Sequence, residues 1–250
     1  MEFLLTVCKN NTPVFNKTIF HSFDDQGNYQ LCFDSQFLIR SLETILYCGT
    51  PIKVIETIQF KHMQFCKITC SDYPSKQNLF VIKENTTHSH QRTRSLPTLR
   101  KIQEKLKSLY KTPYLWGGTL PHGLKNDEHY FKSNKILTPF EEKCFRFEGL
   151  DCSGLLYHVT NGYTPRNTSH LMNFGRLTRD LKPLDLILWP GHCIIILDEN
   201  RTIEAREFDG LIICPLKKRL SEIKEKRKWV ESINSYSQDS TVYTTRRFLK

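Results

Sequence analysis

Hydrophobic and polar positions alternate in short runs over the first third of the chain, a pattern typical of β-strands. The stretch TILYCGTPIKVIETI (44–58) is rich in β-branched and aromatic residues and is broken by Gly-Thr-Pro. Two further runs, MQFCKITC (63–70) and NLFVIK (78–83), are separated by the turn-like SDYPSKQ. Because several short strands joined by turns are typical of a small barrel, we predict a small β-barrel over residues 1–83.

The pattern changes after residue 83. ENTTHSHQRTRS (84–95) is polar and lacks large apolar residues, so it is predicted to be a linker. Ser95 is predicted to start a helix in LPTLRKIQEKLKSLY, where leucine and isoleucine recur at helical spacing. Residues 119–147 show no clear periodicity, and a segment of this length without a pattern is typical of a functional loop such as a lid.

A second helical register begins at Cys152 and continues through Leu155, Leu156 and Val159. After the turn NGYTPRN, three apolar runs predict three antiparallel strands, namely LDLILW (184–189), HCIIIL (192–197) and TIEAREF (202–208). A helix followed by such strands predicts an α+β fold for a second domain over residues 96–250.

The composition, 39% hydrophobic and 12% aromatic, is that of a folded globular protein. No apolar run approaches the ~20 residues that cross a bilayer, so we expect no membrane span. The start, MEFLLTVCKNN, has no basic region, and its apolar run is too short for a signal peptide. We therefore expect a cytoplasmic protein and a monomer, with delivery to the cell envelope by an unconventional route as the alternative location.

The nine cysteines are odd in number and irregular in spacing, which is typical of reduced thiols. Cys66 and Cys70, with His62 nearby, could suggest a metal site. However, QFCKITC alternates like a strand, and no second ligand pair follows at zinc spacing. We therefore expect neither a metal nor a cofactor.

The net charge is +10, and the segment KKRLSEIKEKRK (217–228) carries seven basic and two acidic residues. Such a run could attract a polyanion or an acidic substrate. It is equally typical of a solvated helix whose apolar side is formed by Leu220 and Ile223. Because no recognition motif accompanies the charge, we favour the helix and expect no nucleic-acid partner.

Cys152 differs from the other cysteines in its position in the first turn of a predicted helix. The free N–H groups and the partial positive charge of a helix N-terminus favour a thiolate there. A nucleophilic cysteine also needs a base, and His192 begins a strand directly after Pro-Gly. Taken singly, each residue has an ordinary explanation, because Cys152 could be a buried thiol and His192 a turn histidine.

Glu204, on the next predicted strand, could orient His192 if the hairpin register allows the two to meet. A three-residue loop, 198–200, pairs Leu197 with Arg201 and makes Glu204 a diagonal neighbour of His192 on one face. A two-residue loop would send Glu204 to the opposite face. A Cys-His-Glu triad therefore predicts the longer loop.

Several motifs now carry a resemblance. PYLWGGT (113–119), GLDCSGLLYHV (149–159), TPRNTSH (164–170), LKPLDLILW (181–189) and GHCIIILDENRTIEAR (191–206) occur in the order and spacing of the NlpC family of papain-like cysteine peptidases. TTRRFL (244–249) resembles that family's closing strand. The resemblance implies that Cys152 is the nucleophile and His192 the base. It places the third catalytic position at Glu204, where the family more often has histidine.

The resemblance also implies substrate contacts. Tyr114 matches a groove tyrosine that helps to hold the oxyanion. In relatives that cut cell-wall peptides, the acid before the nucleophile binds the free amine of an N-terminal L-alanine, which corresponds to Asp151, assisted by Ser153 and Thr168. Such relatives often carry an N-terminal bacterial SH3-type domain. Residues 1–83 resemble one loosely, with Tyr73 as a candidate substrate contact.

These inferences predict a bacterial cysteine endopeptidase. It would hydrolyse the γ-D-glutamyl–diamino-acid bond of peptidoglycan stem peptides that carry a free N-terminal L-Ala, in cell-wall recycling or remodelling. The alternatives are a related papain-like amidase or acyltransferase, and a non-catalytic cell-wall-binding module. The sequence leaves the diamino acid open, as well as the choice between free peptides and intact peptidoglycan.

Overall fold

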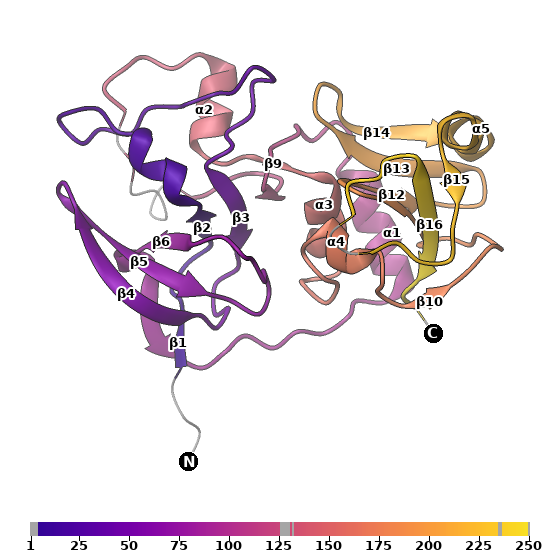
Figure 1. The fold of residues 1–250 in the computed structure, drawn as a ribbon, viewed down its shortest axis with the longest axis horizontal. Helices are drawn as coiled ribbons and strands as arrows, with labels where there is room; N and C mark the ends of the chain where they lie inside the picture. Colours follow the sequence, from indigo (N-terminus) through magenta and orange to yellow (C-terminus); the bar gives the residue numbers. More distant parts are fainter. Residues whose placement is uncertain (1–4, 126–130, 132, 235–236, 250) are drawn as a thin grey trace. The chain divides into compact units, whose positions relative to one another are not determined.

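The computed structural model of this chain describes residues 5–125, 131, 133–234 and 237–249. The chain divides into two compact units, coloured by sequence in Figure 1. The first unit consists of residues 1–93 and 115–149, and the second consists of residues 94–114 and 150–250. The segment 115–149 therefore interrupts the second unit in sequence while it belongs to the first.

The first unit contains a five-stranded antiparallel sheet in the order β3-β2-β6-β5-β4. Its strands are β2 (Thr12–Phe15), β3 (Leu42–Leu46), β4 (Lys53–Phe60), β5 (Met63–Thr69) and β6 (Leu79–Ile82). The predicted strand runs are thereby confirmed, but the predicted barrel is not. Over the described residues the sheet stays open, because β4 pairs with β5 alone and most of its side chains face solvent.

A second pairing lies within the predicted linker. Thr86–Ser89 forms β7, which pairs antiparallel with β1 (Leu5–Cys8) in a sheet of its own. No residue of β7 is fully buried, so the strand has no apolar alternation by which its sequence could be recognised. Two short 3-10 helices, Lys17–His21 and Lys83–Asn85, complete this part of the chain.

The segment predicted as a functional loop contributes to the core of the first unit. The rings of Phe131 and Tyr29 stack at 4.3 Å, and Phe147 lies 5.9 Å from Phe15. The segment also contains β8 (Thr119–Leu120) and α2 (Pro139–Phe145), and β9 (Gly149–Leu150) follows it. Residues 126–130 and 132 of this predicted loop lie outside the described residues.

The second unit is built on a seven-stranded sheet whose main path runs β10-β16-β11-β12-β13-β14, with β15 paired to β16. Its strands are β10 (Arg176–Leu177), β11 (Leu186–Trp189), β12 (His192–Ile196), β13 (Arg201–Arg206), β14 (Gly210–Pro215), β15 (Lys228–Trp229) and β16 (Val242–Arg247). Its helices are α1 (Leu99–Ser108), α3 (Cys152–Val159), α4 (Thr168–Leu171) and α5 (Leu216–Lys226). The predicted meander β11-β12-β13 is confirmed as antiparallel.

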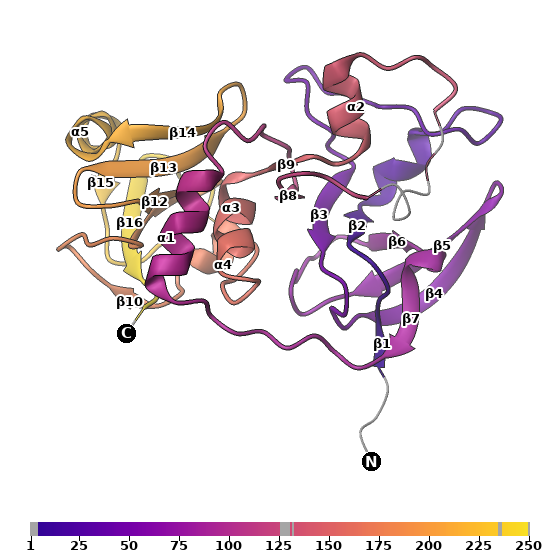
Figure 2. The same cartoon turned by 180° about the vertical axis from the view of Figure 1, so that it is seen from behind.

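Alternate side chains of β11 and β12 form cores on opposite faces of this sheet. Leu186, Leu188, Cys193 and Ile195 join a cluster with residues of α1 and α3, and α3 packs against β12 and β13. The intervening residues, Ile187, Trp189, Ile194 and Ile196, cluster with Ile223 of α5. Figure 2 shows α1 and α3 on the same side of the strands, seen from behind.

The helix predicted to start at Ser95 begins four residues later, at Leu99, with Thr98 as its N-cap. The Thr98 hydroxyl accepts a hydrogen bond from the Lys101 N–H at 3.4 Å, so the cap is Thr98 and not Ser95. Ile102 and Leu106 are the buried residues of this helix, which confirms its predicted apolar side.

The hairpin between β12 and β13 has the register on which the predicted triad depends. Ile195 pairs with Ile203, and the Leu197 N–H donates to the Arg201 carbonyl at 2.9 Å. The loop is therefore the three-residue one, 198–200, and the prediction of the longer loop is confirmed. This register places His192 and Glu204 on the same face of the sheet.

Candidate active site

Cys152 is the first residue of α3, and Asp151 is the N-cap of that helix. The Cys152 side chain is almost buried, and two oxygens lie near its sulfur. They are Thr168 Oγ1 at 3.9 Å and the Gly191 carbonyl at 3.8 Å. Gly191 has a φ of +84°, which favours glycine, and it directly precedes His192. The β11–β12 turn therefore presents both a backbone oxygen and the imidazole beside the thiol.

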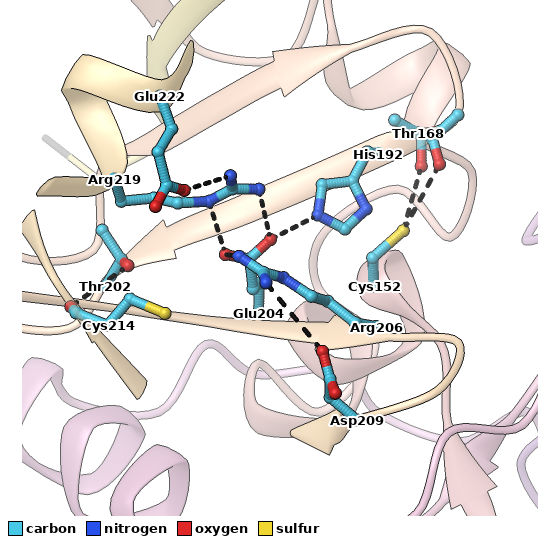
Figure 3. A network of polar contacts seen from close by, with 11 residues as sticks. Cys152, Thr168, His192, Thr202, Glu204, Arg206, Asp209, Cys214, Arg219 and Glu222 are labelled. Carbon is cyan, nitrogen blue, oxygen red and sulfur yellow. Dashed lines mark hydrogen bonds and ion pairs between the residues drawn. The ribbon is translucent and has the colours of Figure 1, made fainter. Parts of the chain in front are cut away.

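His192 and Glu204 form a direct pair. The Nε2 atom of the imidazole lies 2.7 Å from Glu204 Oε2, and the His192 side chain is 18% exposed whereas that of Glu204 is fully buried. Because Nε2 faces a carboxylate, it carries the proton of this hydrogen bond. Figure 3 shows the other ring nitrogen turned toward the side where Cys152 lies.

Two arginines complete the surroundings of Glu204 (Figure 3). Arg219, from α5, donates from Nε to Oε1 at 2.7 Å and from Nη2 to Oε2 at 2.9 Å. Arg206, from the same strand as Glu204, donates from Nη2 to Oε1 at 3.0 Å. Each oxygen of this buried carboxylate thus accepts from at least two cationic groups, so the carboxylate is fixed in one orientation.

These contacts shift both members of the pair. Burial would raise the pKa of Glu204, but hydrogen bonds from His192, Arg206 and Arg219 outweigh it and lower that pKa to about 2. Burial would likewise lower the pKa of His192, but its interactions with Cys152 and Glu204 outweigh it and raise that pKa to about 9. Near neutral pH the pair is therefore a carboxylate and an imidazolium.

Asp151 lies in a different network. Its Oδ1 accepts the Gly154 N–H at 2.6 Å, which caps α3. Arg166, which is buried, donates from Nη1 to Oδ1 at 3.0 Å and from Nη2 to Oδ2 at 2.6 Å. Ser153 accepts from Arg166 at 2.9 Å and donates to Asp151 at 3.2 Å. The carboxylate beside Cys152 is therefore already matched by an internal cation.

The other predicted site residues are spread over both units. Thr168 begins α4 and lies beside the sulfur, as given above. Tyr114 forms a backbone bridge with Leu150 and packs against the core around α3. Tyr73 belongs to the first unit, where its hydroxyl donates to Glu43 at 2.8 Å. The roles of Tyr114 and Tyr73 in substrate binding stay predictions.

Other buried cysteines have an environment that suppresses reactivity. Burial raises the pKa of both Cys8 and Cys144 to about 12, and it raises the pKa of Cys193 well above its ordinary value. These thiols stay protonated at neutral pH. Among the described residues, no group of three or more His, Cys, Asp or Glu side chains could hold a metal ion.

Sequence reasoning did not assign roles to Arg166 and Arg219. Arg219 had a detectable signal, because Leu216, Arg219, Leu220 and Ile223 follow the spacing of one helix face and Ile223 is buried. An arginine on the apolar side of a helix needs a buried partner. Arg166 lies in a turn without periodicity, so nothing local distinguishes it from an exposed arginine.

The sequence matches no protein-family model. It also matches no curated protein. In the described part of the chain, no helix is both long enough and apolar enough to cross a membrane.

Solved structures similar to this chain are NlpC/P60 proteins. One is an NlpC/P60 family protein from Bacillus cereus, with 14% identity, a TM-score of 0.39, and a match over 99% of this chain and 64% of that one. NlpC2 and NlpC1 from Trichomonas vaginalis each show 11% identity and a TM-score of 0.35 over 99% of this chain, and 74% and 70% of their own lengths. The chain thus spans less than two thirds of the Bacillus cereus protein.

Proposed function

We propose that this chain is a cysteine peptidase that uses Cys152 as nucleophile, His192 as acid and base, and Glu204 to orient the imidazole. The observation that carries the proposal is the 2.7 Å pair between His192 and a fully buried Glu204, next to a cysteine at a helix N-terminus. A buried carboxylate that holds an imidazole, with a thiol on the ring's other side, is the arrangement of nucleophilic catalysis.

In the proposed reaction, the Cys152 thiolate attacks the carbonyl carbon of an amide and forms a tetrahedral intermediate. The His192 imidazolium then gives its proton to the leaving amine, and the C–N bond breaks to leave a thioester on Cys152. Water, deprotonated by neutral His192, attacks the thioester. Release of the carboxylic acid restores the thiolate and the imidazolium. Glu204 remains a carboxylate throughout, which its low pKa favours.

The substrate class we propose is the peptidoglycan stem peptide, cut between γ-D-glutamate and the diamino acid. This part of the proposal rests on the sequence motifs around Cys152, His192 and Thr168. For Asp151 we propose a shared role, in which a substrate amine adds to a carboxylate already bonded to Arg166. The ammonium group must therefore approach a partly compensated charge, so its contribution to binding is modest.

The test is cleavage of L-Ala-γ-D-Glu-diaminopimelate, followed by mass spectrometry of the products. We expect the wild-type protein to release diaminopimelate and Cys152→Ala to release none, while Cys193→Ala, a matched buried thiol, keeps its activity. Cleavage that persists in Cys152→Ala would overturn the mechanism. Acetylation of the N-terminal amine tests the specificity separately, because unchanged cleavage of the acetylated peptide would exclude amine recognition.

A further inference from the structure

Two arginines of the basic segment 217–228 lie near His192 and Glu204. Arg219 is held by Glu204 and by Glu222, whose Oε2 accepts from Arg219 Nη1 at 3.0 Å. Arg227, at the end of α5, has no such partner. Among the residues that the structure describes, it forms no side-chain hydrogen bond or ion pair, and its Nε is buried without an acceptor.

Arg227 is held in place by stacking and by its backbone. Its guanidinium carbon lies 4.2 Å from the ring centre of Trp189, and its N–H donates to the Ile223 carbonyl at 2.8 Å as the C-cap of α5. The residue as a whole is partly exposed. A fixed guanidinium with a covered face, a solvent-accessible portion and no anion beside it is suited to bind a carboxylate.

The same tryptophan links Arg227 to the reaction. The rings of Trp189 and His192 lie 4.8 Å apart, and the two residues face each other across the β11–β12 hairpin. Arg227 therefore cannot lie farther from the imidazole than these two short distances combined. Since His192 donates a proton to the leaving amine, groups that flank it face the leaving half of the substrate.

We propose that Arg227 binds a carboxylate on the leaving half of the substrate, and that the enzyme thereby selects peptides with an acidic group after the scissile bond. The inference rests on the proposed peptidase function. Arg179 stacks on Trp229 at 3.9 Å in the same unit, where the indole N–H donates to the Thr245 hydroxyl at 3.0 Å, and this stack serves as a matched control.

The test compares three peptides. They are L-Ala-γ-D-Glu-L-Lys, the same peptide with the lysine carboxylate converted to an amide, and the same peptide with the D-glutamate α-carboxylate converted to an amide. We expect the wild-type enzyme to cleave the first peptide more efficiently than the second. In Arg227→Met, the KM for the first peptide should rise about ten- to a hundredfold, while the second is cleaved nearly as before.

Two variants control this test. Arg227→Lys keeps the charge without the planar fork, so it should retain part of the preference for the lysine carboxylate. Arg179→Met removes a comparable stack and should leave the preference unchanged. The inference would be overturned if Arg227→Met changed the KM of the first two peptides equally. It would also be overturned if the variant lost only the discrimination between the first peptide and the third, in which the D-glutamate carboxylate is an amide. If wild-type protein cleaves none of the peptides, the peptidase proposal itself fails.

Discussion

Asp151 and Glu204 are both buried carboxylates that accept two hydrogen bonds from one arginine, yet their surroundings differ in one respect. Arg166 and the N-terminus of α3 occupy Asp151 with groups that do not titrate near neutral pH. Glu204 also accepts from Arg219 and Arg206, but its Oε2 accepts from His192 as well, a group that does titrate. Thus one carboxylate caps α3, whereas the other stabilises the charged form of an imidazole. The residue type alone does not distinguish these roles.

The largest expected effect is on the free energy of unfolding, when Asp151 loses its arginine partner. Replacing Arg166 by Met leaves a buried carboxylate without its counter-charge, because the Arg166 and Asp151 side chains are only 2% and 12% exposed. We expect the free energy of unfolding to fall by about 3–5 kcal/mol in urea titrations. The double variant Arg166→Met with Asp151→Asn removes both charges and should recover part of this loss. A loss below about 1 kcal/mol would mean that the pair is solvated.

The next effect is on the pH profile, through Glu204. The folded-state pKa of His192, about 9, lies above its ordinary 6.5, so the imidazolium is stabilised fully below pH 6.5 and the stabilisation is lost as pH rises through about 9. Glu204→Gln removes the negative charge, and the alkaline limb of kcat/KM should move down by roughly 1–3 pH units. The value of kcat/KM should be measured from pH 5 to 10 at intervals of about half a pH unit.

The same variant can be checked without a substrate. NMR titration of His192 should show its pKa falling in Glu204→Gln, while Glu207→Gln, a half-buried carboxylate on the following turn, leaves it in place. An unchanged His192 pKa would show that Glu204 does not act on the imidazole.

A smaller effect, with the opposite sign, is expected at Arg219. Replacing it by Met leaves Glu204 with His192 and Arg206, and it removes a positive charge from the vicinity of the imidazolium. The alkaline limb should therefore move up by less than about one pH unit, while the unfolding free energy falls by about 1–3 kcal/mol. Lys218→Met, an exposed change in the same basic segment, should alter neither quantity. A downward shift in Arg219→Met would contradict this account.

The smallest effect is expected at a partly exposed ion pair on the hairpin between β12 and β13. Arg201 Nη2 lies 2.6 Å from Asp198 Oδ2, but the two side chains are 47% and 27% exposed. Replacing Arg201 by Met should lower the unfolding free energy by less than about 1 kcal/mol and leave the pH profile unchanged. A larger loss would show that this pair also sets the hairpin register.

The sequence predicted those features that depend on local pattern. Alternation predicted the strands of the meander, but it left the length of the β12–β13 loop open, and only the hypothesis of a Cys-His-Glu triad predicted the three-residue loop 198–200. Closure of a barrel depends on the pairing of edge strands far apart in sequence, which alternation does not specify. Likewise, no local rule tells which arginine pairs with a buried carboxylate. Arg166 and Arg219 are each 15 residues from their partner, and the fold alone brings them together.

The position of β16 sets a condition on how the second unit is made. This strand, Val242–Arg247, lies between β10 and β11 in the main path of the sheet, with Ile187 paired to Thr245. During translation, β11 has no partner on that edge until residue 247 has left the ribosome. Until then the nascent unit exposes an unpaired apolar strand, which is a template for aggregation. Completion of this sheet therefore waits for residues 242–247, and we expect chaperones to bind the unit until those residues have left the ribosome.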